Sequence, residues 1–103
     1  MAQQDYFQNK VNEAPENKLF RFSLAKILFD KTLFSEAIPH LRKCVELENN
    51  WMLAQILLGK AYLQTGQYNE AKASLTKALD LAIEQKHEDP KTEILKLLDD
   101  LSH

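Results

Sequence analysis

The chain has 103 residues, of which 45% are hydrophobic and 27% are charged, and its formal net charge at pH 7 is −2. This length and balance exclude a disordered chain and favour a single folded domain over residues 1–103. The slightly negative charge argues against nucleic-acid binding. The apolar runs are far shorter than the roughly 20 residues of a membrane span, so we expect no membrane insertion.

A shortage of turn-forming residues predicts helix throughout the chain. The sequence has only two glycines and three prolines, the residues that most often end regular elements. Its single cysteine, Cys44, cannot form an internal disulfide. The first ten residues, MAQQDYFQNK, do not have the pattern of a secretory or transit peptide. We therefore expect a protein of the reducing cytoplasm.

Residues 1–16 are expected to form a partial structural unit that consists of one N-terminal helix. Phe7 precedes Leu41 by 34 residues, and Pro15 precedes Asn49 by the same number. This offset is the period of a repeat that occupies most of the remaining chain. The N-terminal segment therefore corresponds to the second half of one repeat.

Two repeats follow, the first over residues 17–50 and the second over residues 51–87. One fixed shift, which places position 17 on position 51, aligns them, with these identical pairs: Leu19/Leu53, Leu24/Leu58, Lys26/Lys60, Glu36/Glu70, Ala37/Ala71, Leu41/Leu75, Lys43/Lys77 and Leu47/Leu81. The hydrophobic periodicity indicates two helices in each repeat, which in the second repeat cover about residues 51–64 and 68–86.

Small residues mark the expected contact between the two helices of a repeat. Gly59 lies inside a helix, where glycine costs about 1 kcal/mol relative to alanine. We therefore expect the second helix to approach its backbone closely, through Ala71 and Ala78. Gly66 suits a left-handed cap at the end of the first helix, and Thr32 stands at that position in the first repeat.

Residues 88–103 are expected to form a capping helix, because the last unit of a stack cannot cover its own open face. We expect Asp89 to be the N-cap, with Pro90 at the first helical position. The apolar residues of this helix form one stripe, made of Ile94, Leu97, Leu98 and Leu101.

The pattern resembles the tetratricopeptide repeat family, in which the 34-residue unit is a helix-turn-helix. The resemblance is carried by Leu58, Gly59, Tyr62, Gly66, Tyr68, Ala71, Leu75 and Ala78, and in the first repeat by Leu24, Ala25, Leu28, Phe34, Ala37, Leu41 and Cys44. The chain departs from the family where Arg21 and Gln55 replace its early tryptophan. The resemblance implies an all-α solenoid of antiparallel helix pairs, in a small stand-alone protein of the bacterial type.

The first helices of the two repeats carry a second stripe, on a face that the intra-repeat packing does not use. It consists of Leu19, Phe22, Lys26 and Phe29 in the first repeat and Leu53, Ile56, Lys60 and Leu63 in the second. The resemblance implies that this stripe lines a concave groove for peptides. We therefore predict a non-enzymatic adaptor or scaffold that binds a peptide or helix of a partner protein through apolar anchors.

Charge indicates what such a partner carries. Residues 18–31 sum to +3, and residues 88–103 sum to −3 with histidine neutral. Lys26 and Lys60 are expected to pair with carboxylates of an acidic and apolar partner. The carboxylate clamp of some family members is not expected, because Lys26 is the only charged residue at the matching positions.

Alternatives to peptide binding stay open at this stage. The N-terminal segment or the capping helix covers the stripe as core, or a homodimer buries it. We expect no enzyme, cofactor or metal site, because His40, His87 and His103 have no partners at metal-ligand spacing and Cys44 aligns with the small packed residue Ala78.

Overall fold

Six α-helices follow one another in the computed structural model, which describes residues 3–102. They are α1 (Gln3–Glu13), α2 (Lys18–Asp30), α3 (Phe34–Leu47), α4 (Met52–Gln64), α5 (Tyr68–Glu84) and α6 (Glu88–Leu101). The described residues contain no strand, and the expected all-α solenoid of helix pairs is confirmed. Met1, Ala2 and His103 belong to the expected domain but lie outside the described residues.

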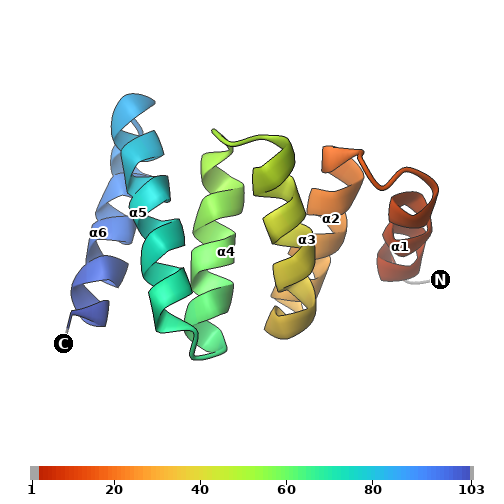
Figure 1. Ribbon diagram of the computed structural model, residues 1–103, viewed down its shortest axis with the longest axis horizontal. Coiled ribbons are helices and arrows are strands. Elements are labelled where there is room, and N and C mark those ends of the chain that lie inside the picture. Colours follow the sequence, from red (N-terminus) through yellow and green to blue (C-terminus); the bar gives the residue numbers. More distant parts are fainter. Residues whose placement is uncertain (1–2, 103) are drawn as a thin grey trace.

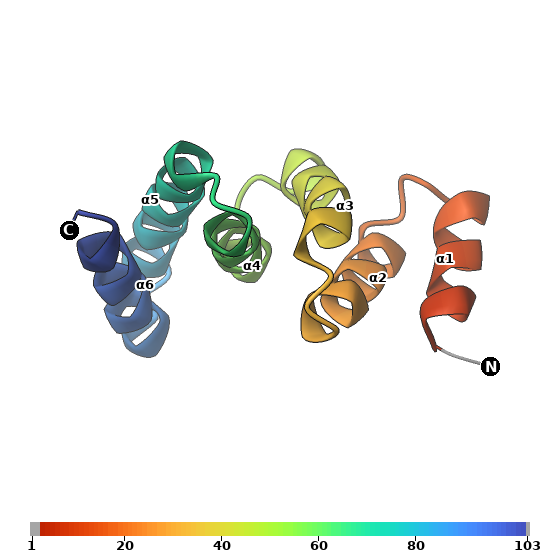
Figure 2. The same cartoon turned by 90° about the horizontal axis from the view of Figure 1, so that it is seen from below.

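The helices stand side by side in an elongated stack of 41 × 27 × 20 Å (Figure 1). Each helix packs against the next one in the chain, and α2 also contacts α4. Seen from below, α2, α4 and α6 form one row, and α3 and α5 lie on the other side (Figure 2). The N-terminal helix α1 packs on α2, and its last residue, Glu13, aligns with Leu47 at the end of α3 in the register of the repeats. The partial unit expected over residues 1–16 stays a prediction, and α1 lies against α2 as that prediction requires.

The close approach of helices expected at Gly59 is confirmed. A β-carbon added to Gly59 lies 2.7 Å from Cγ and Cδ2 of Leu75 on α5. Carbon atoms in ordinary van der Waals contact are about 3.5–4.0 Å apart, so only glycine fits without movement of Leu75. Leu75 has no exposed surface, and neither have Ala71 and Ala78 beside it. Packing thus offsets the helix-propensity cost of this glycine.

A left-handed residue ends α2, α4 and α5. Thr32, Gly66 and Lys86 have φ of 62°, 75° and 59°. After each, a backbone N–H donates to the carbonyl five residues earlier, in the bonds Leu33→Leu28, Gln67→Tyr62 and His87→Ala82, all 2.9 Å long. This is the Schellman pattern. The predicted cap at Gly66 is confirmed, and Thr32 takes the same conformation although β-branched residues seldom do.

The predicted start of the last helix is wrong. His87 is the N-cap of α6 and Glu88 its first residue, so Asp89 and Pro90 lie within the first turn. The carboxylates of Glu88 and Asp89 there lie near the positive end of the helix dipole, which favours them at that place. The apolar stripe of this helix is oriented as expected, with Ile94 fully buried.

Candidate functional site

The row of α2, α4 and α6 carries the predicted stripe, and we call the outer face of this row the groove surface. Aromatic contacts fix its α2 part. Phe22 stacks on Trp51, which precedes α4, with ring centroids 4.7 Å apart. Phe29 meets Phe34 edge-on at 5.1 Å. Both stripe phenylalanines are half-buried, so they contribute more to the junctions of the chain than to its open surface.

Two other stripe residues of α2 are exposed. Leu19 has 64% of its surface exposed. The Lys26 ammonium lies 2.8 Å from a carboxylate oxygen of Asp30, one turn further along the same helix. Such exposed ion pairs contribute little to stability, so this contact leaves Lys26 able to exchange partners.

On α4 the stripe divides into covered and open residues. Ile56 is buried among residues of α5 and α6, and Leu63 is half-buried between the two hydrophobic clusters of the chain. Leu53 is 45% exposed. The Lys60 ammonium lies 3.2 Å from a carboxylate oxygen of Glu93 on α6. The capping helix therefore covers part of the stripe, as one of the alternatives anticipated.

Between α4 and α6 the groove surface is hollowed by a pocket of about 320 Å³. Leu53, Ile56 and Leu57 supply apolar side chains from α4, and Asp89 and Glu93 supply carboxylates from α6. Small-molecule and side-chain sites commonly combine an apolar floor with a few polar groups in this way. The pocket brings together three of the predicted residues, Leu53, Ile56 and Lys60.

The α6 residues of this pocket were missed by sequence reasoning. The prediction treated α6 only as a cap, although its carboxylates at positions 89 and 93 are one helical turn apart and share a face. That spacing was the sequence feature that could have indicated a pair of carboxylates on one face of α6. It becomes informative once α6 is placed in the same row as α2 and α4, as in Figure 2.

Charge varies along the groove surface from one end to the other. The segment with α2 carries the excess of positive charge, and the segment with α6 the excess of negative charge. The Lys60–Glu93 pair joins the two between α4 and α6. These sums cover all faces of each segment, and Arg21 of the basic segment is bonded to His40 on α3 and to the Pro15 carbonyl.

The buried titratable groups lie away from the groove surface. Burial raises the pKa of the Cys44 thiol to about 12, and its Sγ is 3.9 Å from the Lys18 carbonyl oxygen. Such a thiol is not a nucleophile at neutral pH. Burial, followed by the charge of Arg21, lowers the pKa of His40. Arg21 Nη1 donates to His40 Nδ1 at 3.2 Å, so His40 is a neutral acceptor there.

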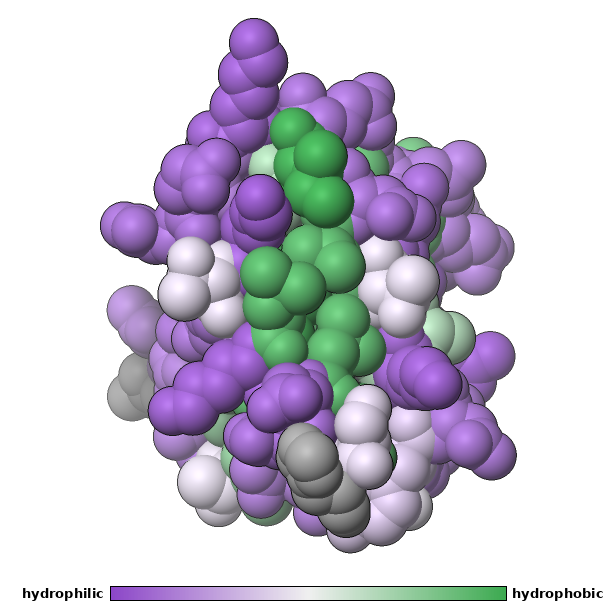
Figure 3. All heavy atoms as spheres, turned by 90° about the vertical axis from the view of Figure 1, so that its left-hand side faces the viewer, coloured by the Kyte–Doolittle hydropathy of each residue, from purple (hydrophilic) through white to green (hydrophobic). Residues whose placement is uncertain are grey.

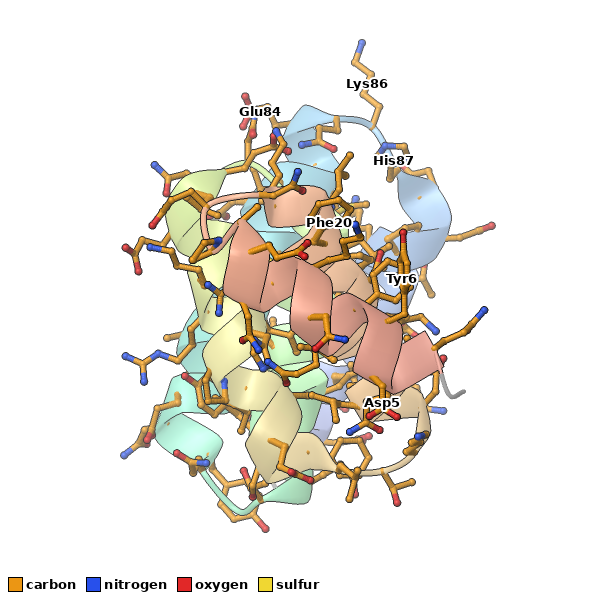
Figure 4. All side chains as sticks on the ribbon, turned by 90° about the vertical axis from the view of Figure 1, so that its right-hand side faces the viewer. Asp5, Tyr6, Phe20, Glu84, Lys86 and His87 are labelled. Atoms are coloured by element: carbon orange, nitrogen blue, oxygen red, sulfur yellow. The ribbon has the colours of Figure 1, made fainter. Side chains whose placement is uncertain are left out.

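The two ends of the stack differ in character. At the C-terminal end, α5 and α6 present a continuous hydrophobic strip bordered by hydrophilic side chains (Figure 3). Ile83 and Leu95, which are 54% and 46% exposed, belong to these two helices. At the N-terminal end, α1 lies across the stack with Asp5 and Tyr6 near its start (Figure 4). Lys10 sits 5.4 Å from the Tyr6 ring centroid, which places a cation over this exposed aromatic.

Neither a metal-binding cluster nor a membrane-spanning helix is found among residues 3–102. No group of three or more His, Cys, Asp or Glu side chains in this range is arranged to hold a metal ion. No helix of the same residues has the length and apolar character to cross a membrane.

Comparison with known proteins relates the chain to a family and a fold. Residues 16–102 match the family described as "Regulator of microtubule dynamics protein 1-3". Anaphase-promoting complex subunit 3 of Dictyostelium discoideum is 36% identical over 77 residues, which cover 75% of this chain. The chain spans only 8% of the length of that relative.

Solved structures share the fold at low sequence identity. PcrH, in complex with the chaperone binding region of PopD, is 18% identical with a TM-score of 0.86, and the match covers 96% of this chain and 75% of that one. The first TPR of Spaghetti (RPAP3), bound to the HSP90 peptide SRMEEVD, is 21% identical with a TM-score of 0.81, covering 97% and 78%. The predicted tetratricopeptide fold is therefore confirmed.

Proposed function

Because the chain belongs to the family of regulator of microtubule dynamics proteins 1-3 and folds as tetratricopeptide repeats, we propose that its groove surface binds a peptide or helix of a partner protein. Two proteins with this fold, PcrH and the first TPR of Spaghetti, are described in complexes with a protein region and a peptide. The partner of this chain is defined below by its chemistry.

The observation that carries the proposal is the pocket between α4 and α6. Its volume of about 320 Å³ and its floor of Leu53, Ile56 and Leu57 suit one apolar side chain of a partner. Burial of such a side chain contributes about 1.5–3 kcal/mol when it is complete. Ile56 is covered by α6, so Leu53 at the lip is the residue that a partner contacts most directly.

Charge orients the bound segment. Lys26 and the basic α2 segment attract the acidic end of a peptide, and Asp89 and Glu93 attract its basic end. The partner is therefore an apolar segment with acidic residues on one side and basic residues on the other. This refines the sequence-based expectation of an acidic partner, because the carboxylates of Asp89 and Glu93 also line this surface.

The test compares two equivalent exposed leucines. Peptides are selected on the immobilised chain from a random phage-displayed library, resynthesised, and measured by fluorescence anisotropy. Leu53→Gln replaces the apolar side chain at the pocket lip by an uncharged polar one and is expected to weaken binding at least about tenfold, as loss of an anchor does. Leu19→Gln is the matched control, because it makes the same uncharged change at the equivalent position of the first repeat and outside the pocket. Its effect is expected to stay within about threefold. Equal effects of the two variants contradict the proposal.

Self-association through the C-terminal end is a second candidate function. A hydrophobic strip runs over α5 and α6 (Figure 3), and exposed apolar patches mark interaction sites. Ile83 on α5 and Leu95 on α6 are exposed hydrophobic residues of these two helices. Sedimentation velocity of the wild type and of an Ile83→Lys/Leu95→Lys variant tests this candidate. A concentration-dependent dimer that the variant loses supports it, and a wild-type monomer at all concentrations excludes it.

We further expect a cytoplasmic, non-enzymatic role for the chain. Its one cysteine is buried with a raised pKa, so it suits a reducing compartment as a packing residue rather than as a reactive group.

A further inference from the structure

A second cavity opens on the side of the stack opposite the groove surface. It is a trough of about 490 Å³ between α3 and α5, with α4 as its floor. Figure 2 shows α3 and α5 on the side away from the row of α2, α4 and α6. The exposed walls include Arg42 and Glu46 on α3 and Lys77 on α5, and the buried floor includes Gln55 on α4 and Ser74 on α5.

The floor holds two buried polar side chains without partners. Gln55 is 9% exposed and Ser74 is 8% exposed, and neither side chain forms a hydrogen bond with another residue of the range 3–102. Their polar atoms are not among the solvent-inaccessible ones that lack a partner, so they are open to the trough that both residues line. There an amide and a hydroxyl are available to water or to a ligand.

The first repeat has different side chains at the positions equivalent to Gln55 and Ser74. In the register that aligns the repeats, Arg21 and His40 correspond to Gln55 and Ser74. Arg21 and His40 bond each other, with Arg21 Nη1 donating to His40 Nδ1 at 3.2 Å. Arg21 Nη2 also donates to the Pro15 carbonyl at 2.7 Å. In the first repeat the arginine is held by these two bonds, and it lines a smaller, separate cavity of about 290 Å³ with residues of α3. In the second repeat the shorter pair leaves its polar groups to a ligand.

The charges on the walls favour an anion. Two cationic side chains, Arg42 and Lys77, line the walls against one carboxylate, Glu46, which lies 3.5 Å from Lys43. Arg42 and Lys77, on opposite walls, form no ion pair within the described part of the chain. A guanidinium and an ammonium that line the same trough over a polar floor match a carboxylate, which accepts several charge-assisted hydrogen bonds at once.

We propose that this trough is a second binding site, which takes an acidic side chain of a partner protein. The carboxylate lies between Arg42 and Lys77 and accepts hydrogen bonds from the Gln55 amide and the Ser74 hydroxyl. The open walls allow a peptide backbone to continue in both directions along the surface. The site is independent of the groove surface, because the two share no lining residue.

The test is an NMR titration of the ¹⁵N-labelled full chain with the peptide Ac-Ala-Glu-Ala-NH₂. We expect saturable shifts of the Gln55 side-chain amide and of the Ser74 and Lys77 backbone amides, with a Kd of about 1–10 mM for one such contact. The neutral peptide Ac-Ala-Gln-Ala-NH₂ is expected to bind at least about tenfold more weakly. Equal binding of the two peptides overturns the proposal. Tighter binding of free glutarate than of the acidic peptide also overturns it, because the ligand is then a small acid.

Variants separate the trough from general surface charge. Lys77→Met is expected to weaken binding about fivefold or more, whereas Lys72→Met, an exposed lysine of the same helix outside the trough, leaves it within about twofold. Gln55→Leu is expected to weaken binding while the melting temperature stays unchanged or rises, since the amide has no partner to lose. Equal effects of Lys77→Met and Lys72→Met, or undisturbed binding in Gln55→Leu, refute the site.

Discussion

The two repeats reach the same backbone with different side chains. Both have an apolar packing face and a left-handed residue after the first helix. Elsewhere they diverge. Asn17 caps α2 by accepting from the Phe20 amide at 3.0 Å, whereas Trp51 at the equivalent position of α4 has no capping bond and stacks on Phe22 instead. The comparison shows that the helix pair needs particular side chains at only a few positions. The side chains at the other positions are free to form binding sites.

The largest effects on stability are expected at the packing contact between the two helices of a repeat. Leu75→Ala removes a fully buried side chain and is expected to cost about 2–5 kcal/mol of unfolding free energy. Gly59→Ala forces a methyl group against Leu75, an overpacking of about 1–3 kcal/mol from which a helix-propensity gain of about 1 kcal/mol is subtracted. Urea unfolding followed by circular dichroism measures both.

The Gly59→Ala/Leu75→Ala double variant tests whether these two residues interact sterically. With alanine at position 75 the added methyl group has room, so the combined cost is expected to be less than the sum by about 0.5–3 kcal/mol. The equivalent pair of the first repeat, Ala25→Gly with Leu41→Ala, relieves no clash and is its control. Strict additivity in the second repeat contradicts a steric role for Gly59.

An exchange of turn residues between the repeats comes next in size. Thr32 has φ of 62°, and a β-branched residue in the left-handed region is strained by about 1–2 kcal/mol. Thr32→Gly is therefore expected to raise the melting temperature, and Gly66→Thr to lower it by a similar free energy. A β-carbon on Gly66 meets nothing within 4 Å, so the second change reports backbone strain alone. A melting temperature that falls in Thr32→Gly would falsify this account.

The capping difference is expected to have a smaller effect. Asn17→Ala removes the side-chain bond to the Phe20 amide and is expected to cost about 1 kcal/mol, the usual value for an N-cap. Asn17→Asp keeps an acceptor at the same position and is the control, with an expected change below about 0.5 kcal/mol. Thermal melts at pH 7 measure both. Equal losses in the two variants would mean that the cap does not stabilise α2.

The smallest effect concerns the polar pair that differs between the repeats. Burial and Arg21 hold the pKa of His40 below its usual value, so the unfolded chain binds a proton more readily than the folded one. Stability is therefore expected to fall as pH drops below about 6.5, the ordinary histidine pKa, towards the lower folded value. Chemical unfolding at pH 7.5 and 5.5 measures this slope. His40→Gln should reduce it, and an unchanged slope would assign the pH dependence to other groups.

Most of the fold was predictable because backbone constraints recur at a fixed spacing. Gly59 marks the close approach of α5, and Gly66 marks a left-handed turn that glycine favours, so both indicate the helix pair. Helix periodicity supplies the remaining elements. The start of α6 was not predictable in this way. The second helix of the second repeat has 17 residues and that of the first has 14. Lys86, rather than a glycine, takes the left-handed conformation that ends it.

The candidate site was predictable only in part. Periodicity placed Leu53 and Lys60 on the face of α4 that borders the pocket, because a helical wheel reports direction. It does not report which neighbour covers that direction, so the burial of Ile56 under α6 and the carboxylates of Asp89 and Glu93 were missed. The trough was missed for the same reason, since Gln55 and Ser74 become a pair only when α4 and α5 are packed together.

The stack of Trp51 on Phe22 gives the molecule an intrinsic optical reporter. Trp51 is the one tryptophan of the sequence, and its ring stacks on Phe22 at the junction between the two repeats. Emission from this indole therefore follows the joint itself, without a label. A ligand that bends or straightens the solenoid changes the colour and lifetime of that emission, even when the helix content stays constant.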